Sequence, residues 1–258
     1  MSEKTYSFPD VSLLITHYNR PESLERLLKS FNDLGCNFGE IIVSDDGSKA
    51  ENIDKVKLLK QNYSFTLVTT PVNRGLGNNI NKGQRAVTKA YTLYVQEDFV
   101  PNDNFPDKLK ISLGYMDSDK ALDVVRFYAY TLYPFLKPVG HGFSQMIFKP
   151  FSFFDTYNKF YMYSDHPHLR RSSFLEKFGT YKEGVNVEKA EYSMMMSFLK
   201  KNGKALFYED FQGLFDQKNS TSEPSTFERN WKRHPTNFFI RAARHLYRHV
   251  KFNVNYHF

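Results

Sequence analysis

The sequence of 258 residues contains a single cysteine, Cys36, which excludes an internal disulfide and a cysteine-based metal cluster. It has no apolar run long enough to cross a membrane, and its first residues, MSEKTYSFPD, lack the apolar region of a signal peptide. We therefore expect a cytoplasmic protein. Its length suits one large domain with a complete core, followed by a tail.

Acidic residues are absent from the end of the chain. Between Arg229 and Phe258 there are seven Lys or Arg residues and no Asp or Glu, so the other 28 basic residues balance the 28 acidic ones. The net charge of +7 thus belongs to the tail. A domain that binds nucleic acid would carry the basic excess itself, so we do not expect nucleic acid as a partner.

Short apolar runs alternate with segments of helical spacing in the first hundred residues. They predict strands at 11–16, 40–44, 65–69 and 91–95, and helices at 21–31, 51–62 and 76–90. This alternation predicts a mostly parallel α/β sheet flanked by helices. The second half is less regular, with expected helices at 104–116, 172–178 and 187–202 and expected strands at 122–128, 143–148 and 205–208.

Polar motifs follow the expected strands. They are Thr16-His17-Tyr18-Asn19-Arg20, Asp45-Asp46-Gly47-Ser48, Asn73-Arg74-Gly75 and Gln96-Glu97-Asp98. Each alone also fits an ordinary turn or surface loop, because Asp, Asn and Gly favour turns. Ligands of parallel sheets, however, bind beyond the carboxyl ends of the strands, which is where all four motifs lie. Carboxylates there can accept bonds from a base or ribose and hold Mg²⁺ or Mn²⁺, and arginines can bind phosphate.

With these motifs in this order, the sequence resembles the family 2 glycosyltransferases of the GT-A fold, closely over 11–100 and more loosely over 140–210. The resemblance implies an inverting transfer from a UDP-, GDP- or dTDP-sugar to an acceptor hydroxyl, and of these donors we expect a UDP-sugar. The implied cofactor is Mn²⁺ or Mg²⁺. It also implies site roles: nucleotide contacts by Thr16, Tyr18 and Asp45, diphosphate contacts by Arg20 and Arg74, and the metal contact by Asp98. Asp46 and Glu97 complete the expected donor site, and the departure is Gln96, where the family usually has Asp.

An inverting displacement needs a base that takes the proton of the acceptor hydroxyl. The resemblance places it at the start of the helix expected at 187–202, where this chain lacks the Glu-Asp pair of the family. We expect Glu191 to be the base and Glu188 to be second in order. The alternative is that both belong to a solvated helix face.

The segment from Tyr163 to Arg171 is unusually polar. Asp165, His166 and His168 are candidates for acceptor binding or for a metal ligand, and the alternative is a structural loop. No further ligand spacing supports a zinc site.

The tail interleaves aromatic residues with Arg and His. On a helix, Phe239, Ala243, Leu246 and Val250 share a stripe, which suits either an anionic membrane surface or packing on the domain. We therefore expect a nucleotide-sugar-binding half at 1–100, an acceptor-binding half at 101–225 and a basic aromatic helical tail at 226–258. The expected acceptor is a saccharide or lipid-linked saccharide of bacterial surface polysaccharide synthesis, at the inner face of the cell membrane.

Two other functions fit parts of the pattern. A sugar-nucleotide nucleotidyltransferase also combines an α/β sheet with a metal, but such enzymes usually begin with a glycine-rich loop followed by Arg. A non-catalytic module that binds sugar nucleotides would explain Gln96.

Overall fold

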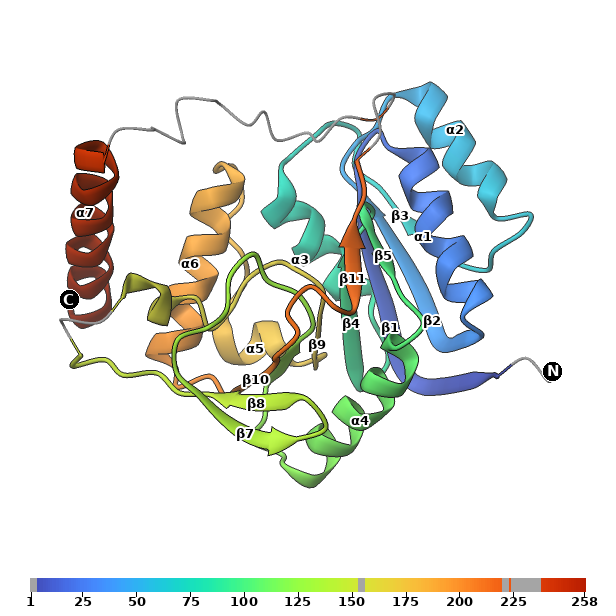
Figure 1. Ribbon diagram of the computed structural model, residues 1–258. Coiled ribbons are helices and arrows are strands. Elements are labelled where there is room, and N and C mark those ends of the chain that lie inside the picture. The colour runs from blue at the N-terminus through green and yellow to red at the C-terminus, as the bar shows by residue number, and fades with distance from the viewer. Residues whose placement is uncertain (1–3, 153–155, 220–222, 224–237) are drawn as a thin grey trace.

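The computed structural model describes residues 4–152, 156–219, 223 and 238–258. Within them a nine-stranded mixed sheet forms the centre, in the order β3-β2-β1-β4-β9-β6-β10-β8-β7. Helices cover both of its faces, and the last helix stands beside α6 at one side of the molecule (Figure 1). The expected α/β fold with a C-terminal helix is confirmed.

All seven elements expected in the first hundred residues are present. They are β1 (Tyr6–His17), α1 (Pro21–Asp33), β2 (Cys36–Asp45), α2 (Ala50–Leu59), β3 (Thr66–Val68), α3 (Leu76–Ala86) and β4 (Tyr91–Gln96). The four strands are parallel, and His17 pairs with Asp45 while Thr16 pairs with Gln96. This register brings the carboxyl ends of β1, β2 and β4 to one edge of the sheet.

The second half adds elements that the sequence pattern missed. In the described residues of this half the elements are β5 (Phe99–Pro101), α4 (Phe105–Ser118), β6 (Val124–Arg126), β7 (Leu136–Gly140), β8 (Phe143–Met146), a 3-10 helix η1 (Tyr157–Phe160), β9 (His168–Arg171), α5 (Phe174–Phe178), α6 (Val187–Lys200), β10 (Ala205–Tyr208), β11 (Phe215–Gln217) and α7 (Phe238–His257). β5, β7, β9 and β11 were not expected. β9 lies antiparallel between β4 and β6, so part of the expected polar loop is a central strand.

Alternate residues of the central strands supply two cores, because successive side chains of a strand point to opposite faces. Leu13 and Ile15 join α1, α2 and α4 on one face, and Leu14 joins α3, α5 and α6 on the other. In β9 the same alternation places Leu169 in the first core, whereas His168 and Arg170 are buried on the second face. Because these buried positions hold polar residues, the sequence of β9 lacks the apolar pattern that predicts a strand.

α7 packs on the domain through a face other than the expected stripe. Phe252 is buried against η1 and α6, whereas Leu246 and Val250 of the stripe are exposed. The side chain of Phe239 and residues 224–237, where the expected tail begins, lie outside the described residues. Within the described part of the chain, none of the helices has the length and apolarity that a membrane crossing needs.

Candidate functional site

Asp45 ends β2 with its carboxylate fully buried. The backbone N–H of Arg20 donates to Nε2 of His17 at 3.1 Å, which leaves the proton on Nδ1, 2.8 Å from Asp45 Oδ1. The carboxylate also accepts the N–H of Ser48 at 3.0 Å, the hydroxyl of Ser48, and the hydroxyl of Thr69 at 2.8 Å. Burial alone would raise the pKa of Asp45, but these hydrogen bonds outweigh it and lower the pKa to about 2. Asp45 is therefore a fixed negative charge.

Asp46 joins the acidic turn to the loop before α3. Its carboxylate accepts the backbone N–H groups of Arg74 and Gly75, both at 2.9 Å, and burial raises its pKa. Gly47 has a φ of +68°, and a Cβ there would overlap the backbone of Val72. The second and third motifs are thus held together, with the Arg74 side chain exposed beside them.

Arg20 brings the first motif to the fourth. Its guanidinium is buried, with Nη1 lying 3.6 Å from Glu97 and 3.5 Å from Asp98. Nη2 donates to Asn219 Oδ1 at 2.7 Å and to the carbonyl of Glu223 at 3.2 Å. Arg20 therefore connects the strand ends to the segment that follows β11.

Asp98 has one carboxylate oxygen in use and one available. Oδ2 accepts Nε2 of Gln217 at 2.9 Å, whereas Oδ1 is buried without a hydrogen-bond partner among the described residues. Burial and the neighbouring charge of Asp98 raise the pKa of Glu97 to about 7, against the opposing effects of His17 and Arg20. Mg²⁺ commonly takes one or two carboxylates and completes its shell with phosphates and water.

The residues present therefore fit a divalent cation held by Asp98 and a diphosphate. They do not form an all-protein cage, since the described part of the chain has no cluster of three or more His, Cys, Asp or Glu suited to a metal.

Glu191 lies close to the strand-end motifs through the backbone of Asp165. Nε2 of Gln96 donates to the carbonyl of Asp165 at 3.2 Å, and the N–H of Asp165 donates to Oε1 of Glu191 at 3.3 Å. Burial raises the pKa of Glu191, against the opposing effects of that hydrogen bond and of Arg126. Glu188 lies one turn earlier on α6 and is exposed. Of the two candidate bases, the structure brings Glu191 next to the motifs.

The Asp165 carboxyl group is fully buried beside Glu191. Tyr181 donates to its Oδ1 at 2.8 Å, and its Oδ2 has no hydrogen-bond partner within the ranges that the structure describes. Burial and the charge of Glu191 raise the pKa of Asp165 well above its ordinary value. Two neighbouring acids with raised pKa values are a common arrangement for proton transfer.

The remaining predicted residues differ in access. His166 is half-buried against the rings of Tyr128 and Tyr130, and burial lowers its pKa to about 3, so it is neutral. His168 is fully buried in β9, where Nδ1 lies 2.7 Å from the carbonyl of His166, so it has no surface for an acceptor.

Thr16 and Tyr18 lie at the end of β1. The Thr16 hydroxyl is buried 3.1 Å from that of Tyr94, whereas Tyr18 is half-buried. Sequence reasoning did not find Gln217, Asn219 or Tyr181. The partners of Gln217 and Asn219 lie more than a hundred residues away in the sequence, and no motif marks any of the three residues.

Comparisons with known proteins show the family and the fold of this chain. The family model described as glycosyl transferase family 2 matches residues 12–179. The poly-beta-1,6-N-acetyl-D-glucosamine synthase of Staphylococcus epidermidis is 31% identical over 96 residues, which are 37% of this chain and 23% of that protein. The enzyme of the same name from Staphylococcus aureus (strain COL) is 27% identical over 96 residues. The chain thus matches less than a quarter of the length of these relatives.

Two solved structures share the fold. Residues 1–349 of Staphylococcus aureus TarS, in complex with UDP-GlcNAc, superpose with a TM-score of 0.59 at 17% identity, over 84% of this chain and 61% of that one. The mannosyltransferase PcManGT of Pyrobaculum calidifontis, in complex with GDP-Man and Mn²⁺, gives a TM-score of 0.57 at 14% identity, over 96% and 66%. At these identities the likeness concerns the fold alone. The family match, however, covers more than half of the chain, from β1 through α5, so this protein belongs to glycosyl transferase family 2.

Proposed function

We propose that this protein transfers a sugar from a nucleotide-sugar, preferably a UDP-sugar, to an acceptor hydroxyl with inversion at the sugar carbon. The observation that carries the proposal is the meeting of Arg20, Asp98 and Glu191 at one edge of the sheet, joined through Gln96 and Asp165. The reaction needs a cationic group to bind the diphosphate, a carboxylate to hold the metal and a base to accept the proton of the acceptor hydroxyl.

The donor would lie along the strand ends. Thr16, Tyr18 and the turn held by Asp45 would surround the nucleoside, while Arg20 and Arg74 would bind the diphosphate. Asp46 would hold the Arg74 loop in place through its two backbone hydrogen bonds. Arg20 suits the role because its guanidinium already faces two carboxylates, so a bound cation could take those carboxylates while Arg20 turned to phosphate.

Asp98 would hold Mn²⁺ or Mg²⁺ through its available oxygen, with Glu97 beside it. When bound, the ion would supply positive charge to the diphosphate leaving group. This protein's own part is to present the carboxylate at the end of β4 and to keep it buried. Gln217 fixes the orientation of that carboxylate through the other oxygen.

Glu191 would take the proton of the acceptor hydroxyl as the oxygen of that hydroxyl attacks the sugar carbon and the bond to the diphosphate breaks. A raised pKa makes a carboxylate a stronger base, and burial provides it here. Asp165 would position Glu191 through its backbone N–H. Protonated Asp165 would add no second negative charge to the site.

The proposed acceptor is a saccharide or a lipid-linked saccharide of bacterial surface polysaccharide synthesis, at the inner face of the cell membrane. The polysaccharide synthases that match the chain support the acceptor class. His166, with the aromatic rings around it, is the candidate for contact with the acceptor, with Asp165 nearby. We leave His168 out of this role because it has no exposed surface.

A thermal-shift screen of UDP, GDP, dTDP and CMP, each with Mn²⁺ or with EDTA, tests the donor site. A ligand that binds the native state raises the melting temperature by mass action. We expect a rise with UDP that EDTA removes, and no such metal-dependent rise in Asp98→Asn. A protein that shows no rise with any of the nucleotides would contradict the proposal.

The binding-module alternative has one observation in its favour, since Gln96 is bonded to the Asp165 backbone and supplies no carboxylate. Glu191→Gln separates the two functions. A transferase would lose turnover and keep nucleotide binding, whereas a binding module would show no turnover before the substitution.

A further inference from the structure

α7 has two apolar faces, and among the described residues only one of them is covered. Phe252 and Tyr256 pack against Phe160 of η1, and Phe252 also packs against Tyr192 of α6. On the opposite side Leu246, Val250 and Val254 are 64%, 52% and 49% exposed. We call these three residues, with Ala243, Tyr247 and Phe258, the outer face.

The spacing of these residues makes the outer face continuous. Leu246, Val250, Val254 and Phe258 follow one another at four-residue intervals, which places them in one row along a helix. Isolated apolar residues on a surface are ordinary, but a row of them over three turns marks an interaction site.

Cationic side chains lie along one flank of the outer face. Arg248 and Lys251 are exposed, and Arg244 is half-buried on the same flank, since residues advance about 100° around a helix. Lys251 lies over the ring of Tyr192, 5.3 Å from its centroid, and Arg248 donates to the Tyr157 hydroxyl at 3.2 Å, so this flank faces α6 and η1. The sequence of α7 has no acidic residue.

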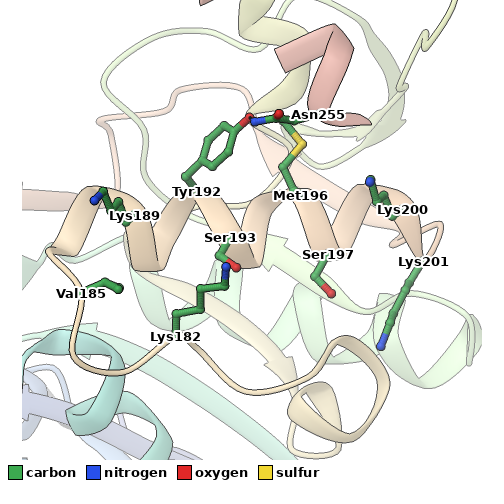
Figure 2. Close-up of a pocket in the computed structure, with 10 residues that line it drawn as sticks. All are labelled: Lys182, Val185, Lys189, Tyr192, Ser193, Met196, Ser197, Lys200, Lys201 and Asn255. Carbon is green, nitrogen blue, oxygen red and sulfur yellow. Dashed lines mark hydrogen bonds between the residues drawn. The ribbon is translucent and has the colours of Figure 1, made fainter. Parts of the chain in front are cut away.

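A pocket of about 520 Å³ lies along α6 and reaches α7 at Asn255 (Figure 2). Lys182, Lys189, Lys200 and Lys201 line it, and no acidic side chain does so among the residues that the structure describes. Met196 and Tyr192 supply apolar surface, and Asn255 of α7 closes one end by donating to the Tyr192 hydroxyl at 2.7 Å.

The pocket is separate from the catalytic site. It opens on the face of α6 formed by Lys189, Ser193 and Lys200, which is opposite to that of Glu191. Lys201 donates to the carbonyl of Lys177 at 2.9 Å, so the other three lysines are the ones placed to meet a ligand.

We propose that the outer face of α7 and the lysine pocket of α6 together dock this protein on an anionic lipid bilayer. The outer face lies in the interface, and the lysines bind lipid phosphates. Apolar residues beside a row of cations match the layered chemistry of such a surface, in which phosphates lie above acyl chains. The inference rests on the proposed function only in its reason for docking, which is access to a lipid-linked acceptor.

A second copy of the chain is the less favourable occupant. A two-fold axis perpendicular to α7, which makes the two helices antiparallel, would place the flank of Arg248 and Lys251 near its own copy, and like charges repel across an interface. An anionic bilayer offers the opposite charge along the whole surface.

Vesicle co-sedimentation of the full chain tests the proposal. We expect binding to vesicles of phosphatidylcholine with about one third phosphatidylglycerol, no binding to phosphatidylcholine alone, and weakening by added salt. Lys189→Gln/Lys200→Gln should reduce the partition coefficient roughly tenfold or more, because each lysine near an anionic surface contributes on the order of 1 kcal/mol. Leu246→Gln/Val250→Gln should reduce it by a similar factor.

Matched controls carry the same changes elsewhere. Lys110→Gln/Lys137→Gln removes two exposed lysines, and Leu58→Gln/Val72→Gln removes two exposed apolar residues. Binding that falls equally in variants and controls, or binding of the wild type to neutral vesicles only, would overturn the proposal. So would complete competition by soluble glycerol phosphate, which would assign the pocket to a free ligand.

The UDP thermal shift is measured on the same proteins. This shift reports on the donor site at the strand ends. A variant that loses vesicle binding but keeps the UDP shift has lost docking alone, whereas a wild type without the UDP shift contradicts the proposed function.

Discussion

Two buried aspartates, Asp45 in the first half and Asp165 in the second, have pKa values shifted in opposite directions. Asp45 accepts hydrogen bonds on both oxygens, and they lower its pKa to about 2 despite burial. Among the described residues Asp165 accepts a hydrogen bond on one carboxyl oxygen only, and it lies beside another acid and has a raised pKa. The strand-end half therefore uses a carboxylate as a fixed structural charge, whereas the second half keeps a carboxyl group that can hold a proton.

The largest effect that would sharpen this comparison is on turnover. Glu191→Gln removes the group that would accept the proton, so we expect transfer to fall roughly a thousandfold, within the usual range for a general base. UDP binding should persist, because the donor motifs lie at the ends of strands and Glu191 lies on α6. Steady-state transfer and thermal shift measure the two properties.

Glu188→Gln is the matched control, as it makes the same change one turn away at an exposed position. Loss of turnover in Glu188→Gln with normal turnover in Glu191→Gln would exchange the two roles.

The second effect is on stability. Asp45→Ala leaves the donors of His17, Ser48 and Thr69 without their acceptor, so the free energy of unfolding should fall by about 3 kcal/mol. Urea unfolding measures it, and Asp54→Ala, which removes an exposed carboxylate, should change it little. An equal loss of unfolding free energy in both variants would show that the hydrogen bonds of Asp45 do not contribute specially to stability.

Acid should reproduce part of this loss. A carboxyl group with a lowered pKa contributes stability above its ordinary pKa of 3.8, and that contribution disappears as the pH falls toward 2. For Asp45 the shift corresponds to about 2 kcal/mol. Urea unfolding of the wild type and Asp45→Ala between pH 5 and pH 2 should therefore converge as the pH falls.

The half around Asp45 was also the predictable half. Its strands are apolar runs that end in short polar motifs, and a parallel sheet brings such ends together whatever the side chains do. Hence the proximity of the motifs after β1, β2 and β4 follows from the pattern, whereas the register that pairs His17 with Asp45 and Thr16 with Gln96 comes from the structure.

The half around Asp165 could not be predicted in the same way. β9 buries His168 and Arg170 among polar partners from α3 and the Tyr163 segment, so its sequence resembles a loop. The contacts of Asp98 with Gln217 and of Arg20 with Asn219 join segments more than a hundred residues apart, and no local pattern encodes them.

The third effect is on the pH dependence of stability, and it has the opposite sign. A carboxyl group with a raised folded pKa opposes folding once the pH exceeds its ordinary value, so wild-type stability should fall as the pH rises from 5 to 8. Asp165→Asn should make this decline less steep. Part of the decline should remain in this variant, because the pKa of Glu97 is also raised. Urea unfolding at several pH values measures the slope, and an unchanged slope would contradict the assignment of a proton to Asp165.

The smallest effect tests the connection between the two halves. Gln96→Ala removes the hydrogen bond to the Asp165 carbonyl and leaves the carboxylates of Glu97, Asp98 and Glu191 in place. One neutral hydrogen bond is worth about 1 kcal/mol, so turnover should fall roughly fivefold while UDP binding stays unchanged. Turnover under saturating donor and the UDP thermal shift measure the two. If UDP binding fell and turnover per bound donor did not, Gln96 would serve the donor site and would not align Glu191 with it.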